Sequence, residues 1–516
     1  MGQVVNSSCP FCYNKAPEWL FHIEYYTHFL NYMPQKPLPA HSTSSSKPDP
    51  ECRFRSLTED QIERLQNASY EILERTGVRF HHPEAVALLK KAGAKVIDNS
   101  LVRIPPELIN KSLKSSPENI TIYNQEGNPA LEVGGYRSYY GTGSDCMHIY
   151  DLDTGTRRKA ILQDVVDGVR LVESLPHLDF VMSMYLPSDV DEDQYERQQM
   201  AIMLRESSKP IIFVGINAAS TVYAIKMASI ASGGLDVLRE HPYIVNYVNT
   251  VSSFQHNYDS VQRLLYAAER NIPTIYGPGK HRGITSPITP AGALALGFAG
   301  QLAGLVLSQI KQEGSPFIIS NPGHGTIDMR SMVGLYASPD DGPHGWDLAH
   351  YHKIPTFAIA GASDAKIFDA QAAAEAALSL FSVTLGGANL IHDIGYLDCA
   401  MTGSLELVAF CNEVIGWLKN YLQDLKINEE TLALDLIHQV GPDGYFLDAD
   451  HTLNHVKEDW MPSLFDRSDF AQWSEDGQYS FLNRAKITVR DTLKSIQPKT
   501  LPADIEQKLQ SVIDET

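Results

Sequence analysis

NIPTIYGPGKHRGITSPITPAGALALGFAGQLAGLVLSQIKQEGSPFIISNPGHGTIDMR, residues 271–330, is the stretch that decides the fold. It predicts a short apolar strand (272–276), a turn rich in Gly and Pro, a long helix, and a second strand (316–320). A strand, a helix and another strand in this order form a βαβ unit. The chain is therefore expected to contain further units of the same kind.

The long helix in this stretch has no charged residue between Arg282 and Lys311. An uncharged span of that length could cross a bilayer. However, Pro287 and Pro290 are residues that start helices, and the body of the segment is rich in Gly and Ala and is diluted by polar residues. We interpret it as a helix that is buried nearly all round inside a globular fold.

The composition of the 516 residues is that of an ordinary globular protein, with 43% hydrophobic and 20% charged residues. The formal net charge is −20, and basic residues do not cluster, which argues against nucleic acid as a partner. Six scattered cysteines do not form the pattern of a secreted disulfide scaffold. The N-terminus has no basic region followed by an apolar one, so we expect a cytoplasmic protein without membrane contact.

Four regions follow from the patterns along the chain. Residues 1–55 are an irregular extension that includes a Pro/Ser-rich linker, and we hypothesise that Met33 is the true start. Residues 56–135 have helical periodicity and predict an α-rich cap. Residues 136–420 predict the main domain, and residues 421–516 predict a helical C-terminal extension.

The main domain has a regular rhythm of strands and helices. Short apolar runs recur roughly every 30 to 40 residues, and each is followed by a turn and an amphipathic helix. Eight such units predict an α/β fold of the (β/α)₈ barrel type, with a doubly wound sheet as the alternative. Since no strand is followed by a complete Gly-rich phosphate loop, we favour the barrel. The eight predicted strands are 137–142, 178–185, 210–217, 242–249, 273–277, 316–320, 355–360 and 388–393.

Barrel enzymes carry their active sites at the carboxyl ends of the strands, so the residues there are the first candidates. His392 and Asp393 form a candidate acid/base pair, although a His at a strand end is also a common structural hydrogen-bonding residue. His324 is flanked by glycines that would allow the backbone to approach a ligand. No arrangement resembles a nucleophile–base pair or a set of metal ligands.

Aromatic and amide side chains dominate the other strand ends. Tyr140, Tyr276 and Tyr396 could wall a cationic ligand, because ring faces bind quaternary ammonium groups. Asn249, at another strand end, is a candidate polar contact. Tyrosines are also common in barrel mouths without any such role, and the sequence leaves both readings open.

Several motifs resemble the trimethylamine methyltransferase family, whose members are amine:corrinoid-protein methyltransferases. The resemblance covers roughly residues 56–473, which is nearly the whole chain after the linker. Five motifs in the same order carry it: GITSPITPAGALALG (283–297), IDMRS (327–331), SDAKIFDAQAAAE (363–375), IHDIGYLDCAMTGSLEL (391–407) and DADHTLNHVKEDWMPSLFDR (448–467).

The resemblance implies a (β/α)₈ barrel that transfers a methyl group from a methylated amine to the Co(I) corrinoid of a separate small protein. It implies that this chain binds no cofactor tightly, because the corrinoid (cobamide) is carried by the partner. It also places the chain in methylamine metabolism of the type found in methanogenesis. The resemblance leaves open whether the chain forms a homo-oligomer.

One departure from the family pattern bears on the substrate. The archetypal trimethylamine enzymes carry pyrrolysine at a position that corresponds to Ala362 or a near neighbour, whereas this chain has only standard residues. It therefore resembles the non-pyrrolysine branch, whose substrates are quaternary amines such as glycine betaine. His324, Arg330, His344 and His392 are then the expected donors to the betaine carboxylate.

Two other functions remain open at this stage. A cobalt-independent barrel lyase or isomerase would use His392 and Asp393 for proton transfer. A non-catalytic barrel would bind methylated amines without converting them. Strand counting alone does not separate these possibilities from methyl transfer.

Overall fold

The computed structural model describes residues 54–279, 281–322, 325–336, 343–458, 460–496 and 501–515. Almost all of the predicted N-terminal extension lies outside these ranges, and so does His324. The proposed start at Met33 therefore stays a hypothesis.

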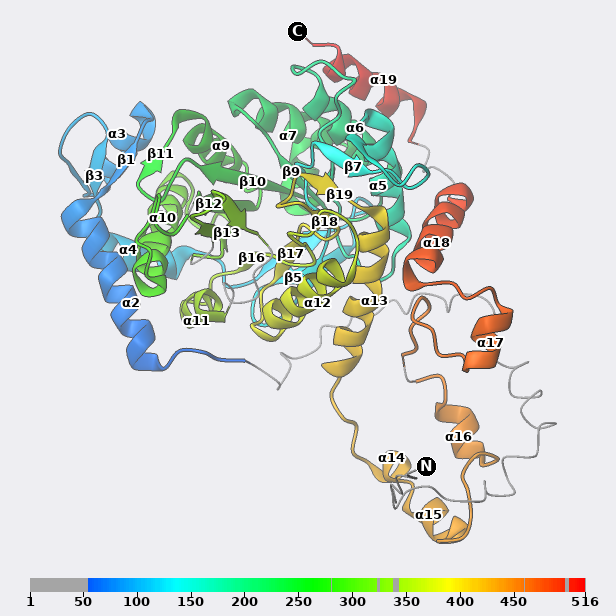
Figure 1. Cartoon of the computed structure of the whole chain (residues 1–516). Helices are drawn as coiled ribbons and strands as arrows, with labels where there is room; N and C mark the ends of the chain where they lie inside the picture. Colours follow the sequence, from blue (N-terminus) through cyan, green and yellow to red (C-terminus); the bar gives the residue numbers. More distant parts are fainter. Residues whose placement is uncertain are drawn as a thin grey trace, which may run out of the picture. The chain divides into compact units, whose positions relative to one another are not determined.

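A curled sheet of seven parallel strands lies at the centre of the fold (Figure 1). Its order is β6-β17-β16-β13-β12-β10-β9, so the strands of this sheet from β9 to β17 lie side by side in chain order, and β6 pairs with β17. Parallel neighbours need a crossover between them, which explains the helix after each strand. Seven of the eight predicted strands are confirmed: β6 (Tyr139–Tyr140), β9 (Ile211–Val214), β10 (Ile244–Thr250), β12 (Thr274–Pro278), β13 (Phe317–Ser320), β16 (Thr356–Ile359) and β17 (Leu390–His392).

The remaining predicted strand, 178–185, does not form a regular strand. Met184 has a φ of 61°, which interrupts the extended conformation that the apolar sequence predicts. The segment still touches both edges of the sheet through two parallel bridges, Gly141–Phe180 and Val181–Ile211.

Helices cover the outer face of the sheet, one or more in each crossover (Figure 1). They are α5 (Leu162–Ser174), α6 (Tyr195–Glu206), α7 (Ala218–Ser232), α8 (Leu235–Glu240), α9 (Tyr258–Glu269), α10 (Pro290–Lys311), α11 (Pro343–Tyr351), α12 (Ala370–Leu385) and α13 (Leu405–Tyr421).

Helix α10 is the uncharged helix predicted within residues 271–330, and its predicted burial is confirmed. Every residue from Ala293 to Gln309 is buried. Of the helices that the structure describes, α10 alone is long and apolar enough to span a membrane, but its apolar side chains face other parts of this chain. A Cβ at Gly304 would lie 2.4 Å from the ring of Tyr276, so the missing side chain lets α10 approach β12 closely.

The N-terminal cap packs against α10 rather than forming a separate core. Thr58 and Gln61 form a capping box that starts its first helix, and Gly77, with a φ of 81°, ends the helical segment. Its small sheet also pairs with β11 (Gln255–His256) of the main domain. The cap comprises α2 (Glu59–Glu71), the π-helix η2 (Ile72–Thr76), β1 (Val78–Phe80), α3 (Pro83–Lys91), β2 (Lys95–Val96), β3 (Leu101–Arg103) and α4 (Pro106–Ser115).

A hairpin of β4 (Ile120–Tyr123) and β5 (Pro129–Val133) closes the amino-terminal end of the central sheet. The N–H of Tyr123 donates to the carbonyl of Pro242, directly before β10, at 2.9 Å. The apolar side chains of the hairpin join those on the inner face of the sheet in one cluster. That inner cluster fills the curled sheet from its amino-terminal end up to Tyr247 and Phe357, beyond which a cavity remains at the carboxyl ends of the strands.

The remaining elements lie in loops and in the C-terminal region. β7 (His148–Tyr150), β8 (Arg157–Lys159), β18 (Tyr396–Leu397) and β19 (Thr402–Gly403) form a small sheet, and β14 (Thr326–Asp328) and β15 (Val333–Leu335) form a hairpin after β13. The helices of the C-terminal region are α14 (Glu429–Leu432), α15 (Leu434–Val440), α16 (Asp450–His455), α17 (Phe470–Glu475), α18 (Phe481–Ser495) and α19 (Ala503–Ile513).

Candidate active site

A cavity of about 400 Å³ lies at the carboxyl ends of the strands, within the range of small-molecule sites. Ligands of parallel α/β sheets bind at this end, because the loops that vary between proteins meet there. The β14–β15 hairpin and the residue after it, Tyr336, form part of the wall. The strand ends and the loop after β6 contribute Ser144, Asp145, Asn249, Pro278, Gly279, Ser320, Asn321, Ile359, His392 and Asp393.

His392, the last residue of β17, is held in one orientation on two sides. Its Nδ1 lies 2.7 Å from Oδ1 of Asp393, and its ring stacks on Phe357 with 3.8 Å between centroids and 8° between planes. The Asp393 carboxylate can only accept a hydrogen bond, so the ring proton lies on Nδ1 and not on Nε2, the other ring nitrogen. The imidazole is thus presented to the cavity with a fixed tautomer.

Asp393 takes up an unusual backbone conformation that places its carboxylate beside His392. Its φ is 69°, a region that non-glycine residues rarely adopt. Besides His392, the hydroxyl of Tyr336 donates to the other carboxylate oxygen, Oδ2. Two donors from different elements therefore fix this carboxylate.

Gly143 leaves the space that Asp393 needs. A Cβ at this position would lie 2.0 Å from Oδ1 of Asp393 and 2.4 Å from the hydroxyl oxygen of Tyr396. We expect Gly143→Ala to displace the carboxylate and lower kcat/KM about 100-fold, because shifts of about 1 Å in a site cost that much. Steady-state kinetics measures the loss.

The control for this change is Gly168→Ala in α5, outside the described cavity lining. A Cβ there would meet its nearest atoms at 3.5 Å, an ordinary contact distance, and the φ of Gly168 is not positive. Its kcat/KM should stay within a few-fold of the parent protein. Equal losses in both variants would contradict a specific role for the close approach at Gly143.

Asp145 is a second carboxylate at the cavity, and its side chain is exposed toward it. Desolvation by the surrounding protein raises the pKa of Asp145, and the nearby Asp393 carboxylate adds to this, against a hydrogen bond from the Ser144 hydroxyl. A cation in the cavity would relieve both unfavourable effects, because it would favour the ionised carboxylate.

Aromatic rings form much of the remaining wall. Tyr247 and Phe357 lie with their ring centroids 4.8 Å apart, and Trp346 and Tyr336 also line the cavity. Burial raises the pKa values of Tyr247 and Tyr336 well above the usual range, so both remain neutral hydroxyls. Among the described lining residues there is no Lys or Arg. The site thus combines ring faces with carboxylates.

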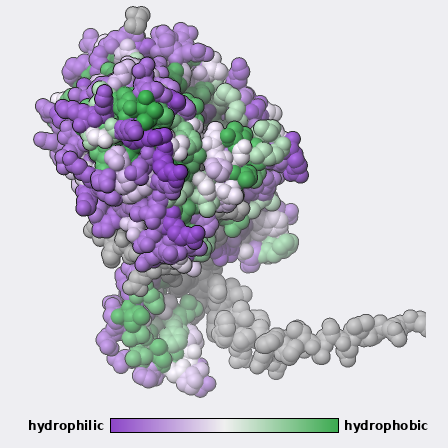
Figure 2. All heavy atoms as spheres, turned by 90° about the vertical axis from the view of Figure 1, so that its left-hand side faces the viewer, coloured by the Kyte–Doolittle hydropathy of each residue, from purple (hydrophilic) through white to green (hydrophobic). Residues whose placement is uncertain are grey.

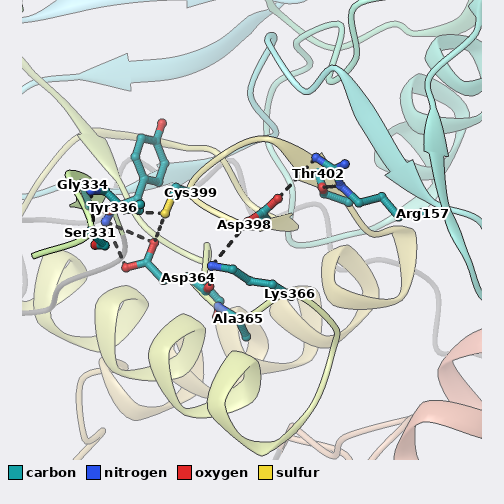
Figure 3. A network of polar contacts seen from close by, with 12 residues as sticks. Arg157, Ser331, Gly334, Tyr336, Asp364, Ala365, Lys366, Asp398, Cys399 and Thr402 are labelled. Carbon is teal, nitrogen blue, oxygen red and sulfur yellow. Dashed lines mark hydrogen bonds and ion pairs between the residues drawn. The ribbon is translucent and has the colours of Figure 1, made fainter. Parts of the chain in front are cut away.

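A network of polar contacts seats the β14–β15 hairpin over the site (Figure 3). The N–H of Tyr336 donates to the Asp364 carboxylate at 3.1 Å. The Cys399 thiol lies 3.2 Å from the Asp364 carboxylate and 3.3 Å from the carbonyl of Gly334, and its single S–H donates to one of these two acceptors at a time. Burial raises the pKa of Cys399 to about 12, so it stays a thiol that can donate. The network therefore sets the position of Tyr336, and through it that of Asp393.

The structure brings three of the predicted site residues together at the cavity: His392, Asp393 and Asn249. Tyr140 and Tyr276 do not line it, because side chains alternate along a strand and both point outward. The Tyr140 hydroxyl bonds to Thr384 of α12 at 2.9 Å, and Tyr276 packs beside α10.

The other predicted residues also lie away from the described cavity lining. Tyr396 and Ala362 are buried in the core outside it. Arg330 pairs with Asp328 on the hairpin and is 91% exposed, and His344 bonds to Ser56 at 2.8 Å. His324 lies outside the described residues.

Among the carboxylates and the Tyr, Trp and Phe rings of the described cavity lining, five were not among the predicted site residues: Asp145, Tyr247, Tyr336, Trp346 and Phe357. Strand alternation could have found Tyr247, which precedes Asn249 by two residues and so shares its face. No local pattern marks Tyr336, because a long loop brings it to the site. Within the described ranges, no group of three or more His, Cys, Asp or Glu side chains is arranged to hold a metal ion.

Comparisons with known proteins agree with the resemblance in the motifs. A glycine betaine methyltransferase of Desulfitobacterium hafniense (strain Y51) is 29% identical over 467 residues, covering 89% of this chain and 97% of that protein. A trimethylamine methyltransferase of D. hafniense (strain DSM 10664 / DCB-2) is 28% identical over 465 residues, covering 89% and 93%. The crystal structure of the Methanosarcina barkeri monomethylamine methyltransferase matches with a TM-score of 0.47 and 12% identity, covering 86% of this chain and 89% of that one.

A family model described as "Trimethylamine methyltransferase (MTTB)" matches residues 39–516. The match spans the cap, the central sheet with its cavity, and the helical C-terminal region. It runs through all five motifs found in the sequence. This chain therefore belongs to the trimethylamine methyltransferase family.

Proposed function

We propose that this chain transfers a methyl group from a quaternary methylated amine, glycine betaine in the first place, to the Co(I) corrinoid of a separate partner protein. The observation that carries the proposal is the cavity at the strand ends, walled by aromatic rings and two carboxylates. Family membership and the name of the glycine betaine relative support the reaction class.

The wall chemistry suits a quaternary ammonium group. Such a group cannot donate a hydrogen bond, and it is held by ring faces and by opposite charge. Tyr247, Phe357 and Trp346 offer the rings, and Asp145 offers the charge. These residues would hold the nitrogen while one N-methyl group points out of the cavity.

The electron balance of the transfer explains why the site needs no nucleophile of its own. The C–N bond breaks with its electron pair going to nitrogen, so a neutral tertiary amine leaves. The electron pair for the new bond to the methyl carbon comes from the acceptor, which is the second substrate. No proton moves, and the main contribution of the protein is to align the amine in a water-poor site.

Apolar side chains on the rim support the docking of an acceptor protein. Val251, Ile284, Ile288, Met329 and Met332 are each more than 50% exposed, and they follow β10, β12 and β14. Exposed apolar groups around the opening of a site are typical of a protein-binding surface.

We infer that residues 179–181 act as an eighth strand that joins β6 to β9 and completes a (β/α)₈ barrel. Besides the two bridges, the hydrogen bonds of Val181 support this: its N–H donates to Pro210 at 2.9 Å, and its carbonyl accepts from Ile212 at 3.0 Å.

A second candidate substrate class is a quaternary amine without a carboxylate, such as choline or tetramethylammonium. It is favoured by Asp145 and Asp393, which would repel a betaine carboxylate, and by the absence of Lys and Arg from the described lining. For a betaine, His281, the amide of Asn249 and the hydroxyl of Ser320 are among the lining groups that can donate, whereas the proton of His392 is already engaged by Asp393. The two classes are separated by experiment.

Incubation with Co(I) cobalamin and a panel of methylated amines under anoxia tests the function. We expect loss of the Co(I) spectrum together with formation of the demethylated amine, dimethylglycine if glycine betaine is the donor. A reaction with choline but not with betaine would select the second class. Because free cobalamin can be a poor substitute, the cognate corrinoid protein is added in a parallel series. Demethylation without any corrinoid, or binding without turnover in both series, would contradict the proposal.

A further inference from the structure

Residues 423–458, here called the arm, leave the main domain from the end of α13 and return to the same helix. The ring of Trp460, directly beyond the arm, lies 6.1 Å from that of Trp417 on α13. Ser463 and Leu464 then donate to the Glu413 carboxylate, the hydroxyl of Ser463 at 2.7 Å. Both ends of the arm are thus fixed to α13.

The arm has no core of its own. None of its residues is buried, including those of α14, α15 and α16. The hydrogen bonds of Thr431, Thr452 and His451 end on other arm residues. A piece of about 40 residues without disulfides or metals is too small to bury a stabilising core alone.

Large apolar side chains cover the arm instead of forming a core. Ten are exposed by more than a third, among them Leu425 at 84%, Ile427 at 71%, Tyr445 at 64% and Leu453 at 55%. In Figure 2 the lower coloured part of the view, where α14–α16 lie, carries a broad apolar area flanked by hydrophilic residues. Apolar surface of this extent marks a site of association.

We propose that the arm packs against a second copy of this chain, on a patch formed by α12 and α13. The patch consists of Leu378 and Phe381 on α12 and Trp417 and Tyr421 on α13, with exposed fractions between 38% and 64%. The rings of Phe381 and Tyr421 lie 5.9 Å apart, so the two helices form one apolar surface. Because this patch adjoins the base of the arm, a two-fold axis there lets each arm cover the patch of the other copy.

The size of the arm fits such an interface. Half of a large apolar side chain is on the order of 80 Å², so ten offer on the order of 800 Å². This is about what one partner contributes to a standard stable interface. Exchange of two arms would double the buried area.

A second copy fits better than the methyl acceptor as the occupant. The acceptor must reach the cavity and leave after each turnover, and the apolar rim there is made of other residues, such as Val251 and Ile284. The arm, in contrast, needs a permanent cover. A second copy is present wherever the chain is made. Each copy supplies one arm and one patch, so every arm in a pair has a patch to cover.

Light scattering after size exclusion tests the proposal on the full chain. We expect a mass of twice 57.3 kDa, or an even multiple, for the parent protein. The arm variant Phe446→Glu/Leu447→Glu and the patch variant Leu378→Glu should each raise the apparent dissociation constant at least about 100-fold. Circular dichroism should show both variants to be folded.

The matched control is Ile97→Glu, because Ile97 is 44% exposed and Phe446 is 42% exposed, but Ile97 lies in the N-terminal cap. This variant should keep the mass of the parent protein. A parent protein that is monomeric at all concentrations would overturn the proposal. So would arm and patch variants that both keep the parent mass.

Discussion

Replacing His392 by alanine is expected to lower kcat/KM for the preferred amine at least about 100-fold. The imidazole sits between Phe357 and the cavity and forms one of the two hydrogen bonds to the Asp393 carboxylate. Without it, the aromatic wall opens and the carboxylate loses a donor. The free energy of unfolding should fall by only about 1–3 kcal/mol, because the lost ring borders an existing cavity. Steady-state kinetics and thermal unfolding measure the two effects.

His392→Asn separates the two roles of the imidazole. The asparagine amide can still donate to Asp393 from a position close to that of Nδ1, but it lacks the ring and Nε2. We expect it to restore thermal stability without restoring turnover. An unchanged kcat/KM in the alanine variant would remove His392 from the site altogether.

Asp145→Asn is expected to weaken binding of a quaternary amine about 5-fold, because the loss of a charge partner that is accessible to solvent costs about 1 kcal/mol. The carboxylate faces the cavity and its pKa is raised, so the free protein holds the proton more tightly than an ordinary Asp does. A bound cation favours the ionised form. Binding by the parent protein should therefore weaken as the pH falls through the raised pKa. Titration calorimetry at several pH values measures this profile.

A neutral isostere of the ligand is the control for Asp145. A tert-butyl analogue has nearly the shape of the trimethylammonium group but no charge, so the parent protein should prefer the cation and Asp145→Asn should lose most of that preference. The pH profile of the variant should be flat over the same range. An undiminished preference for the cation would show that the rings alone recognise it.

The strands were predictable because each is a short apolar run bounded by turn residues, and the structure confirms seven of them. The segment 178–185 has the same apolar pattern, but Met184 leaves the extended region and regular pairing is lost. A local pattern does not reveal such a residue, because loop contacts set its backbone angles. The burial of α10 was predictable because the absence of charged residues can be read from the sequence of the helix alone, without knowing which elements surround it.

The site was only partly predictable. The end of a strand could be located from the sequence, but its register could not, and a shift of one residue turns a side chain to the other face. Tyr276 faces α10, while Ile275 before it joins the inner cluster. Tyr336 illustrates a different limit, since its place depends on contacts with Asp364 and Asp393, far away in the sequence.

The β4–β5 hairpin, which closes the amino-terminal end of the sheet, has a consequence for the kinetics of the proposed reaction. The amine and the acceptor must approach from the same side, where the strand ends and the apolar rim lie. The amine has to be inside before the acceptor covers the opening, and the demethylated amine stays trapped until the acceptor departs. Turnover then follows a compulsory order, in which an excess of acceptor protein inhibits by occupying the opening ahead of the amine.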